Sequence, residues 1–178
     1  SLIVTGVQTC ALPIWSGEGL LVERYHARGY DIHGYDLNYQ SAFVTRADLL
    51  KLQIPDESVD VVLALDVIEH LNFSDQVLAL REIHRVLKPG GRFIASMPNL
   101  AHFSGRLVFL LTGKLLRTST IERHPGDRPM SEYVSLLRQQ FRLNRVRGIF
   151  PTFPISSLLT LAFPAAMLPW HRLLNTIA

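Results

Sequence analysis

Four short groups of small and acidic residues occur in a fixed order in the first 70 residues. They are Ser16-Gly17-Glu18-Gly19, Asp36-Leu37, Asp48-Leu49 and Asp66-Val67. Glycines before a helix let the backbone approach a ligand and leave helix N–H groups free to donate to it. Carboxylates that follow strands can accept hydrogen bonds from ribose hydroxyls or from an exocyclic amine. Together the groups indicate one ligand lying across the ends of several strands.

Each group also has a structural interpretation. Two glycines occur in many turns, and Asp36 could be a turn residue beside Asn38. Asp48 could cap a helix or a turn. His70, at the start of a helix, could hydrogen-bond to the backbone, and His102 could be a surface or core histidine. The order of the four groups therefore carries more weight than any one of them.

The intervening segments alternate between strand and helix patterns. Helices are predicted over residues 19–29, 74–87, 104–116 and 131–141, with strands over 30–36, 42–48, 59–65, 92–99 and 143–150. Ser74 or Asp75 is expected to cap the second helix, and Lys88-Pro89-Gly90-Gly91 to end it. The apolar run "VDVVLAL" suits a strand covered on both faces. The alternation predicts an α/β domain with a mostly parallel sheet.

Composition narrows the class of protein. The chain has 178 residues, of which 48% are hydrophobic and 19% charged, so it can bury a core. The net charge is +3 with the arginines spread out, so no nucleic-acid partner is expected. Cys10 stands alone, which excludes a disulfide within the chain. The histidines are scattered, and the adjacent Glu69 and His70 are expected to point different ways, so no metal site is predicted.

Two longer stretches carry a family resemblance. "DVVLALDVIEHL" and "EIHRVLKPGGRFIASMPN" resemble the class I S-adenosylmethionine-dependent methyltransferases, most closely the small-molecule subgroup. The resemblance covers about residues 16–150 and implies a Rossmann-like, doubly wound sheet with S-adenosylmethionine as cofactor. By position it assigns the methionine part to Gly17 and Gly19, the ribose to Asp36 beside Leu37, the adenine to Asp48 and Leu49, and the border between cofactor and substrate to Asp66 and Val67.

The N-terminal end departs from that family. The expected acid and first glycines of the G-x-G-x-G motif are absent, and "VTGVQTCALPI" (Val4–Ile14) resembles a translated sequencing adapter. A single-base change would also turn the codon of Trp15 into one for glycine. We interpret residues 1–14 as a sequencing or assembly scar; a divergent native N-terminus is the alternative. With its first strand missing or replaced, this exact chain is expected to fold poorly or to bind the cofactor weakly.

Two further departures concern the rest of the chain. Residues 38–42 are too few for a helix between parallel strands, so a loop is expected there. The last, antiparallel strand of the family sheet is not found, which suggests a fragment. After the methyltransferase domain at residues 15–150, residues 151–178 form an apolar segment with four prolines. That segment is expected to be a lid or an interfacial patch that contacts a membrane peripherally. The alternative is a core segment whose partner strand is missing. A membrane-spanning helix is disfavoured because of the prolines.

The resemblance implies methyl transfer by in-line displacement to a small molecule. The apolar stretch "RLVFLLTGKLL" and the C-terminal segment favour a hydrophobic or lipid-linked acceptor, handled in the cytoplasm or at a membrane surface. His70 and His102 are the candidate general bases, needed only if the acceptor is protonated. A nicotinamide-dependent Rossmann oxidoreductase and a non-catalytic methyltransferase-like binding module are the alternatives. The oligomeric state is not predicted.

Overall fold

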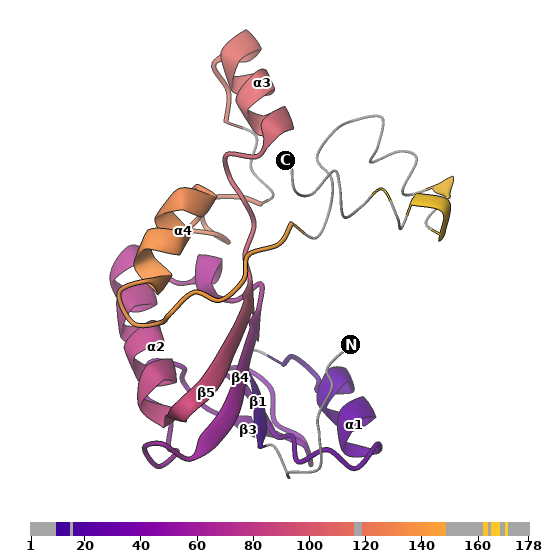
Figure 1. Cartoon of the computed structure of the whole chain (residues 1–178), viewed down its shortest axis with the longest axis vertical. Helices are drawn as coiled ribbons and strands as arrows, with labels where there is room; N and C mark the ends of the chain where they lie inside the picture. The colour runs from indigo at the N-terminus through magenta and orange to yellow at the C-terminus, as the bar shows by residue number, and fades with distance from the viewer. Residues whose placement is uncertain are drawn as a thin grey trace. The chain divides into compact units, whose positions relative to one another are not determined.

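The computed structural model describes residues 10–14, 16–115, 119–148, 162–163, 165–167 and 170, which are coloured in Figure 1. The chain divides into two compact units. The first unit comprises Ser1–Met97 and Glu122–Gly126. The second comprises Pro98–Ile121 and Asp127–Ala178. The first unit contains every candidate residue except His102, which lies in the second.

Five parallel strands form the sheet of the first unit, in the order β3-β2-β1-β4-β5. Their bounds are Ala11–Ile14 (β1), Gly34–Asp36 (β2), Val44–Arg46 (β3), Val59–Leu65 (β4) and Leu87–Ser96 (β5). The strand order reverses between β1 and β4, which is the switch point of a doubly wound sheet. The predicted α/β fold with a mostly parallel sheet is confirmed. The carboxyl ends beside this switch point are where such sheets bind ligands.

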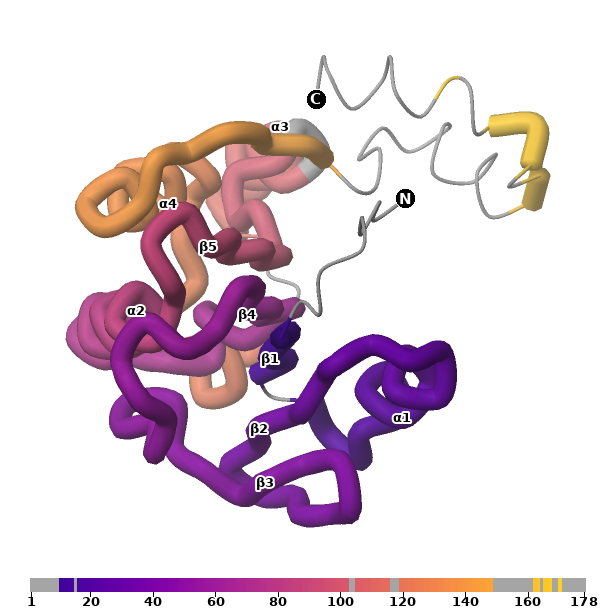
Figure 2. The backbone as a smooth tube through the Cα atoms, turned by 60° about the horizontal axis from the view of Figure 1, so that its bottom comes forward, coloured from indigo at the N-terminus to yellow at the C-terminus, as the bar shows by residue number. Residues whose placement is uncertain are grey.

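The helices of the first unit cover both faces of its sheet. Helix α1 (Leu20–His26) and helix α2 (Phe73–Val86) lie on opposite sides, as Figures 1 and 2 show. A short 3-10 helix, η1 (Ile68–His70), leads from β4 towards α2. Residues 37–43 join the parallel strands β2 and β3 without a helix, as the short spacing predicts.

Helix α2 lies within one residue of its predicted bounds, but the residues predicted to cap it and to end it are wrong. The cap is Asn72, whose side-chain oxygen accepts from the backbone N–H of Asp75 at 2.9 Å, because an extended residue just before the first turn is best placed to do so. At the other end, β5 begins at Leu87, directly after the helix. The glycines expected to end the helix lie inside β5, where the register with β4 shifts between Val59 and Val61.

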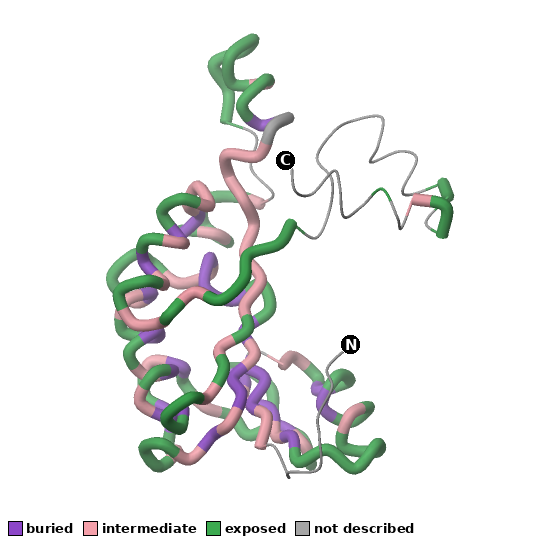
Figure 3. Tube along the Cα trace, in the orientation of Figure 1, coloured by how far each residue is buried: buried purple, intermediate pink, exposed green. Residues whose placement is uncertain are grey.

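The core of the first unit follows the apolar run of β4. Val62 and Ala64 are fully buried, as are Ala79 and Ile83 on α2. Figure 3 shows buried, intermediate and exposed segments along the chain in different colours. This pattern explains why β4 is long: a strand covered on both faces gains apolar burial at nearly every residue.

Strand β1 occupies the centre of the sheet, between β2 and β4. Ala11 donates to the Asp31 carbonyl at 2.9 Å and accepts from the His33 N–H at 3.1 Å, so Ala11 faces β2. Pro13, two residues on, faces the same side but brings no N–H to the ladder. Residues 11–14, interpreted above as part of a scar, therefore form the central strand β1; their origin stays a hypothesis.

The second unit contains α3 (Phe103–Thr112) and α4 (Met130–Leu137). The side-chain oxygen of Asn99 accepts from the backbone N–H groups of Ala101 at 3.1 Å and Met130 at 3.2 Å, which links the approaches to both helices. The strand predicted over 143–150 is wrong for residues 143–148: they form no strand and are mostly exposed, so an alternating pattern there finds no partner.

The predicted lid or interfacial segment, residues 151–178, falls largely outside the described residues. Across the ranges that the structure describes, no helix is both long and apolar enough to cross a membrane.

Candidate functional site

The glycine turn lies between β1 and α1. Gly17 and Gly19 adopt left-handed backbone conformations, with φ of 56° and 88°. A Cβ at Gly19 would lie 2.7 Å from Cγ2 of Val44, so this position tolerates no side chain. Around Gly17, by contrast, the space for a Cβ is open. The turn therefore offers an open stretch of backbone at the carboxyl end of β1, as a cofactor turn requires.

Asp36 ties this turn to the end of β2. One carboxylate oxygen accepts from the Gly17 N–H at 2.9 Å, and the other accepts from the N–H groups of Asn38 at 2.8 Å and Tyr39 at 3.2 Å. The residue is only 5% exposed. A carboxylate has about four lone-pair sites, so three such bonds leave room for a hydroxyl donor. Leu37, next in sequence, is exposed.

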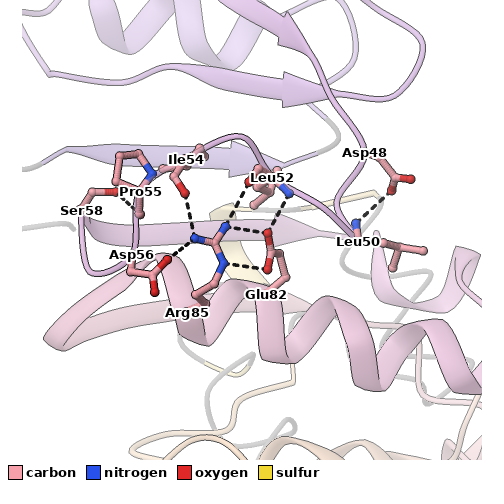
Figure 4. Close-up of polar contacts among 9 residues, drawn as sticks. All are labelled: Asp48, Leu50, Leu52, Ile54, Pro55, Asp56, Ser58, Glu82 and Arg85. Carbon is pink, nitrogen blue, oxygen red and sulfur yellow. Dashed lines mark hydrogen bonds and ion pairs between the residues drawn. The ribbon is translucent and has the colours of Figure 1, made fainter.

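Asp48 and Leu49 follow β3 with opposite burial. Asp48 is exposed, and its Oδ1 accepts from the Leu50 N–H at 2.9 Å (Figure 4). This is the turn-capping arrangement that a structural interpretation expects. Leu49 is buried in the core of the first unit. At this strand end, therefore, the acid is the group that solvent or a ligand can reach.

The loop after Asp48 is fixed by Arg85 of α2 (Figure 4). The guanidinium donates to the carbonyls of Leu52 at 3.0 Å and Ile54 at 2.8 Å, and it pairs with Glu82 at 2.6 Å and Asp56 at 2.5 Å. The hydrogen bond from Arg85 lowers the pKa of Glu82, and the two carboxylates raise the pKa of the guanidinium. Charge-assisted bonds thus anchor the loop between β3 and β4.

Asp66 directly follows β4 and has an unusual backbone conformation, with φ of 54°. Its N–H donates to the Ser96 carbonyl at 3.1 Å, and its Oδ1 accepts from the Ser96 hydroxyl at 2.8 Å. A non-glycine residue in the left-handed region is strained, and such residues cluster at functional sites. Asp66 is exposed, whereas Val67 is fully buried. Asp66 thus presents the polar group at this edge, and Val67 anchors it in the core.

The two candidate bases differ in tautomer. Nδ1 of His70 lies 2.9 Å from the Arg123 carbonyl oxygen, so it must donate there, and Nε2 is left as the acceptor of the neutral ring. Nδ1 of His102 instead accepts from the Gly105 N–H at 3.1 Å and caps α3, which places the proton on Nε2. Burial lowers the pKa of His102. The two rings therefore carry the proton on different nitrogens, Nδ1 in His70 and Nε2 in His102.

One grouping was missed by sequence reasoning. Ligand atoms of Glu69, His70 and His124 all lie within 4.8 Å of one another, so the expectation that Glu69 and His70 point different ways is wrong. The imidazole rings of His70 and His124 meet edge to face, 4.5 Å between centroids. His124 comes from a distant loop, and no local spacing in the sequence signals this approach.

Comparison with protein families matches residues 14–95 to a model described as a methyltransferase domain. A probable S-adenosylmethionine-dependent methyltransferase from Mycolicibacterium smegmatis is 46% identical over 66 residues, which cover 37% of this chain and 25% of that protein. The chain thus spans about a quarter of the length of this curated relative.

Solved structures show the same fold. A methyltransferase from Archaeoglobus fulgidus superposes with a TM-score of 0.61 at 18% identity, covering 79% of this chain and 63% of that one. A protein from Thermotoga maritima, described as a possible histamine N-methyltransferase, gives a TM-score of 0.60 at 22% identity, covering 84% and 72%. Both are S-adenosylmethionine-dependent methyltransferases by description.

Proposed function

We infer that this chain is a class I S-adenosylmethionine-dependent methyltransferase, and we propose that it transfers a methyl group to a small hydrophobic or lipid-linked acceptor. The main observation behind this proposal is the order of the glycine turn, Asp36, Asp48 and Asp66 at the carboxyl ends of β1, β2, β3 and β4. The bond from Gly17 to Asp36 supports this proposal, because it joins the groups assigned to the methionine and ribose parts of one cofactor.

The proposed cofactor contacts follow from this arrangement. Backbone around Gly17 and Gly19 holds the methionine part, and the remaining lone-pair site of Asp36 accepts from one ribose hydroxyl. The exposed carboxylate of Asp48 accepts from the adenine amine, with the exposed Leu37 against the ring. These groups fit the cofactor, although the family's first glycines are absent, so we expect weak binding.

The chemistry requires little beyond positioning. S-adenosylmethionine would supply a methyl group bound to a positively charged sulfonium, and the neutral thioether would be the leaving group. The chain's residues then have to hold the acceptor in line with that group and exclude competing orientations. If the acceptor is a hydroxyl, we propose Nε2 of His70 as the base, because His102 carries its proton on Nε2 while it caps α3.

Exposed apolar side chains support a hydrophobic acceptor. On α3, Leu110 is 80% exposed, and Leu107, Phe109 and Leu111 are also exposed. Large exposed apolar groups on one short helix are typical of surfaces that meet an apolar ligand or lipid. Peripheral membrane contact by residues 151–178 belongs to the same proposal.

Cofactor competition tests the proposal against its alternatives. We expect S-adenosylmethionine to quench intrinsic fluorescence saturably and NAD to leave it unchanged; the reverse result would favour an oxidoreductase. An acceptor screen with radiolabelled methyl donor should then label lipid-soluble alcohols or acids above polar ones. Cofactor binding without transfer to any acceptor class would instead favour a non-catalytic binding module.

A further inference from the structure

We propose that Glu69, His70 and His124 form a binding site for a first-row divalent metal ion, with zinc preferred. Their ligand atoms already lie within 4.8 Å of one another. Two imidazoles and a carboxylate are a donor set that zinc uses in catalytic sites. All three residues belong to the first unit, so the site depends on one compact body alone.

A dedicated set of contacts brings His124 to this place. The side chain of Gln76 is fully buried, and its amide nitrogen lies 2.8 Å from the Gly126 carbonyl and 3.0 Å from that of Ile68. The Gly126 N–H donates to the Glu69 carbonyl at 3.1 Å. Residues 122–126 are therefore fastened to η1 from two sides, and His124 is held next to His70.

Gly126 makes this close approach sterically feasible. A Cβ at this position would overlap the Leu71 carbonyl oxygen and the Gln76 side chain. Only glycine fits, so the sequence here matches the docked position of the loop. Such a fit distinguishes a built arrangement from a chance meeting of surface histidines.

His70 is also prepared as a ligand. Its Nδ1 donates to the Arg123 carbonyl, and that bond comes from the same loop that carries His124. Metal-binding histidines typically donate their second ring N–H to a carbonyl or carboxylate, which fixes the tautomer and orients the other nitrogen. Nε2 of His70 is therefore the nitrogen that this proposal assigns to the metal.

Distance and burial indicate the metal. A tetrahedral ion about 2.1 Å from each donor needs roughly 3.4 Å between donors, so donors separated by as much as 4.8 Å must draw closer together. Binding should therefore tighten the loop. Glu69 is 1% exposed while both histidines are partly exposed, which leaves a path for the ion and an open coordination position. Imidazole ligands favour zinc or cobalt over magnesium.

The position beside β4 gives the site a chemical role, which rests on the proposed function. Glu69 and His70 follow Asp66 within η1, at the carboxyl end of β4. A metal there would bind an oxygen of the acceptor and lower the pKa of an acceptor hydroxyl. Nε2 of His70 cannot bind a metal and take a proton at once, so the metal would replace the imidazole as activator.

Cobalt titration of the full chain, free of any histidine tag, tests the site. We expect one Co²⁺ per chain with a visible absorption band, displaced by Zn²⁺ but not by excess Mg²⁺. His124→Gln and His70→Gln should weaken Co²⁺ binding more than roughly tenfold. His84→Gln, an exposed histidine on α2, is the matched control and should leave binding unchanged.

Equal Co²⁺ affinity in all four proteins, or no stoichiometric binding, would overturn the metal site. Circular dichroism identifies any variant that fails to fold. If His124→Gln does not fold, His70→Gln alone still tests the site. S-adenosylmethionine titration of the same samples separates the two proposals. Retained cofactor binding without metal binding overturns the metal site alone, and the reverse result overturns the proposed function alone.

Discussion

The two halves of the sheet are built very differently. Strands β1, β2 and β3 have four, three and three residues, whereas β4 has seven and β5 has ten. The half with short strands carries the glycine turn, Asp36 and Asp48. The half with long strands carries Asp66 and the Glu69–His70 pair. The groups assigned to the cofactor thus lie mostly where ladder hydrogen bonds are fewest.

This contrast shows how a weak ladder is compensated. In the short half, side-chain to backbone bonds join the loops, as Asp36 does between the turn after β1 and the loop after β2. In the long half, apolar burial stabilises β4 and α2. The Arg85 network ties the loop between β3 and β4, which joins the two halves, to α2. We therefore expect the short half to open locally at lower free energy than the long half.

The largest expected loss of stability comes from removing the Arg85 network. Arg85→Ala removes bonds to two carbonyls and two carboxylates, and it should lower the free energy of unfolding by about 2–3 kcal/mol. Urea denaturation measures this. Arg81→Ala, an exposed position on the same helix, should change it by no more than about 0.5 kcal/mol. Similar losses in both variants would contradict the anchoring role of Arg85.

Acid should weaken the same network. The folded state lowers the pKa of Glu82 below its ordinary value of 4.5, mainly through the hydrogen bond from Arg85. Its contribution to stability is therefore present above about pH 4.5 and is lost as pH falls through the lowered pKa. Urea midpoints measured from pH 5 to pH 3 should fall more steeply for the parent chain than for Glu82→Gln. Parallel slopes would show that the pair does not contribute.

The smallest expected effect concerns the central strand. Pro13→Val supplies an N–H towards β2 and should raise the free energy of unfolding by about 0.5–1 kcal/mol, since part of the gain is offset by greater freedom of the unfolded chain. Thermal and urea unfolding both report it. Pro55→Val, in an exposed loop, gains no ladder bond and should not stabilise. A destabilised Pro13→Val would indicate that β1 tolerates proline without loss.

Local patterns made most of the fold predictable. The apolar run of β4 and the helical repeat of α2 are strong signals because burial acts residue by residue. The cap at Asn72 was missed since Ser74 and Asp75 offer equally good side chains nearby. The strand predicted over 143–150 failed because alternation alone does not supply a neighbouring strand.

The candidate site also contains residues that local sequence patterns predict and residues that only the folded structure brings together. Gly17, Asp36 and Asp66 follow strands, so the topology alone places them at one edge of the sheet. The approach of His124 to His70 depends on Gln76 and Gly126, contacts between segments far apart in the sequence. No pattern of neighbouring residues encodes such a contact, so only the folded structure reveals it.

Calorimetric titration with S-adenosylmethionine tests the central claim most directly. We predict saturable, weak binding by the parent chain and by Asp31→Asn, an exposed acid outside the turn. Asp36→Asn should bind at least about tenfold less tightly, because an amide can accept fewer of the bonds that join turn, loop and ribose. A folded parent chain that binds no cofactor, or equal affinity in all three proteins, would contradict the assignment of this edge as the cofactor site.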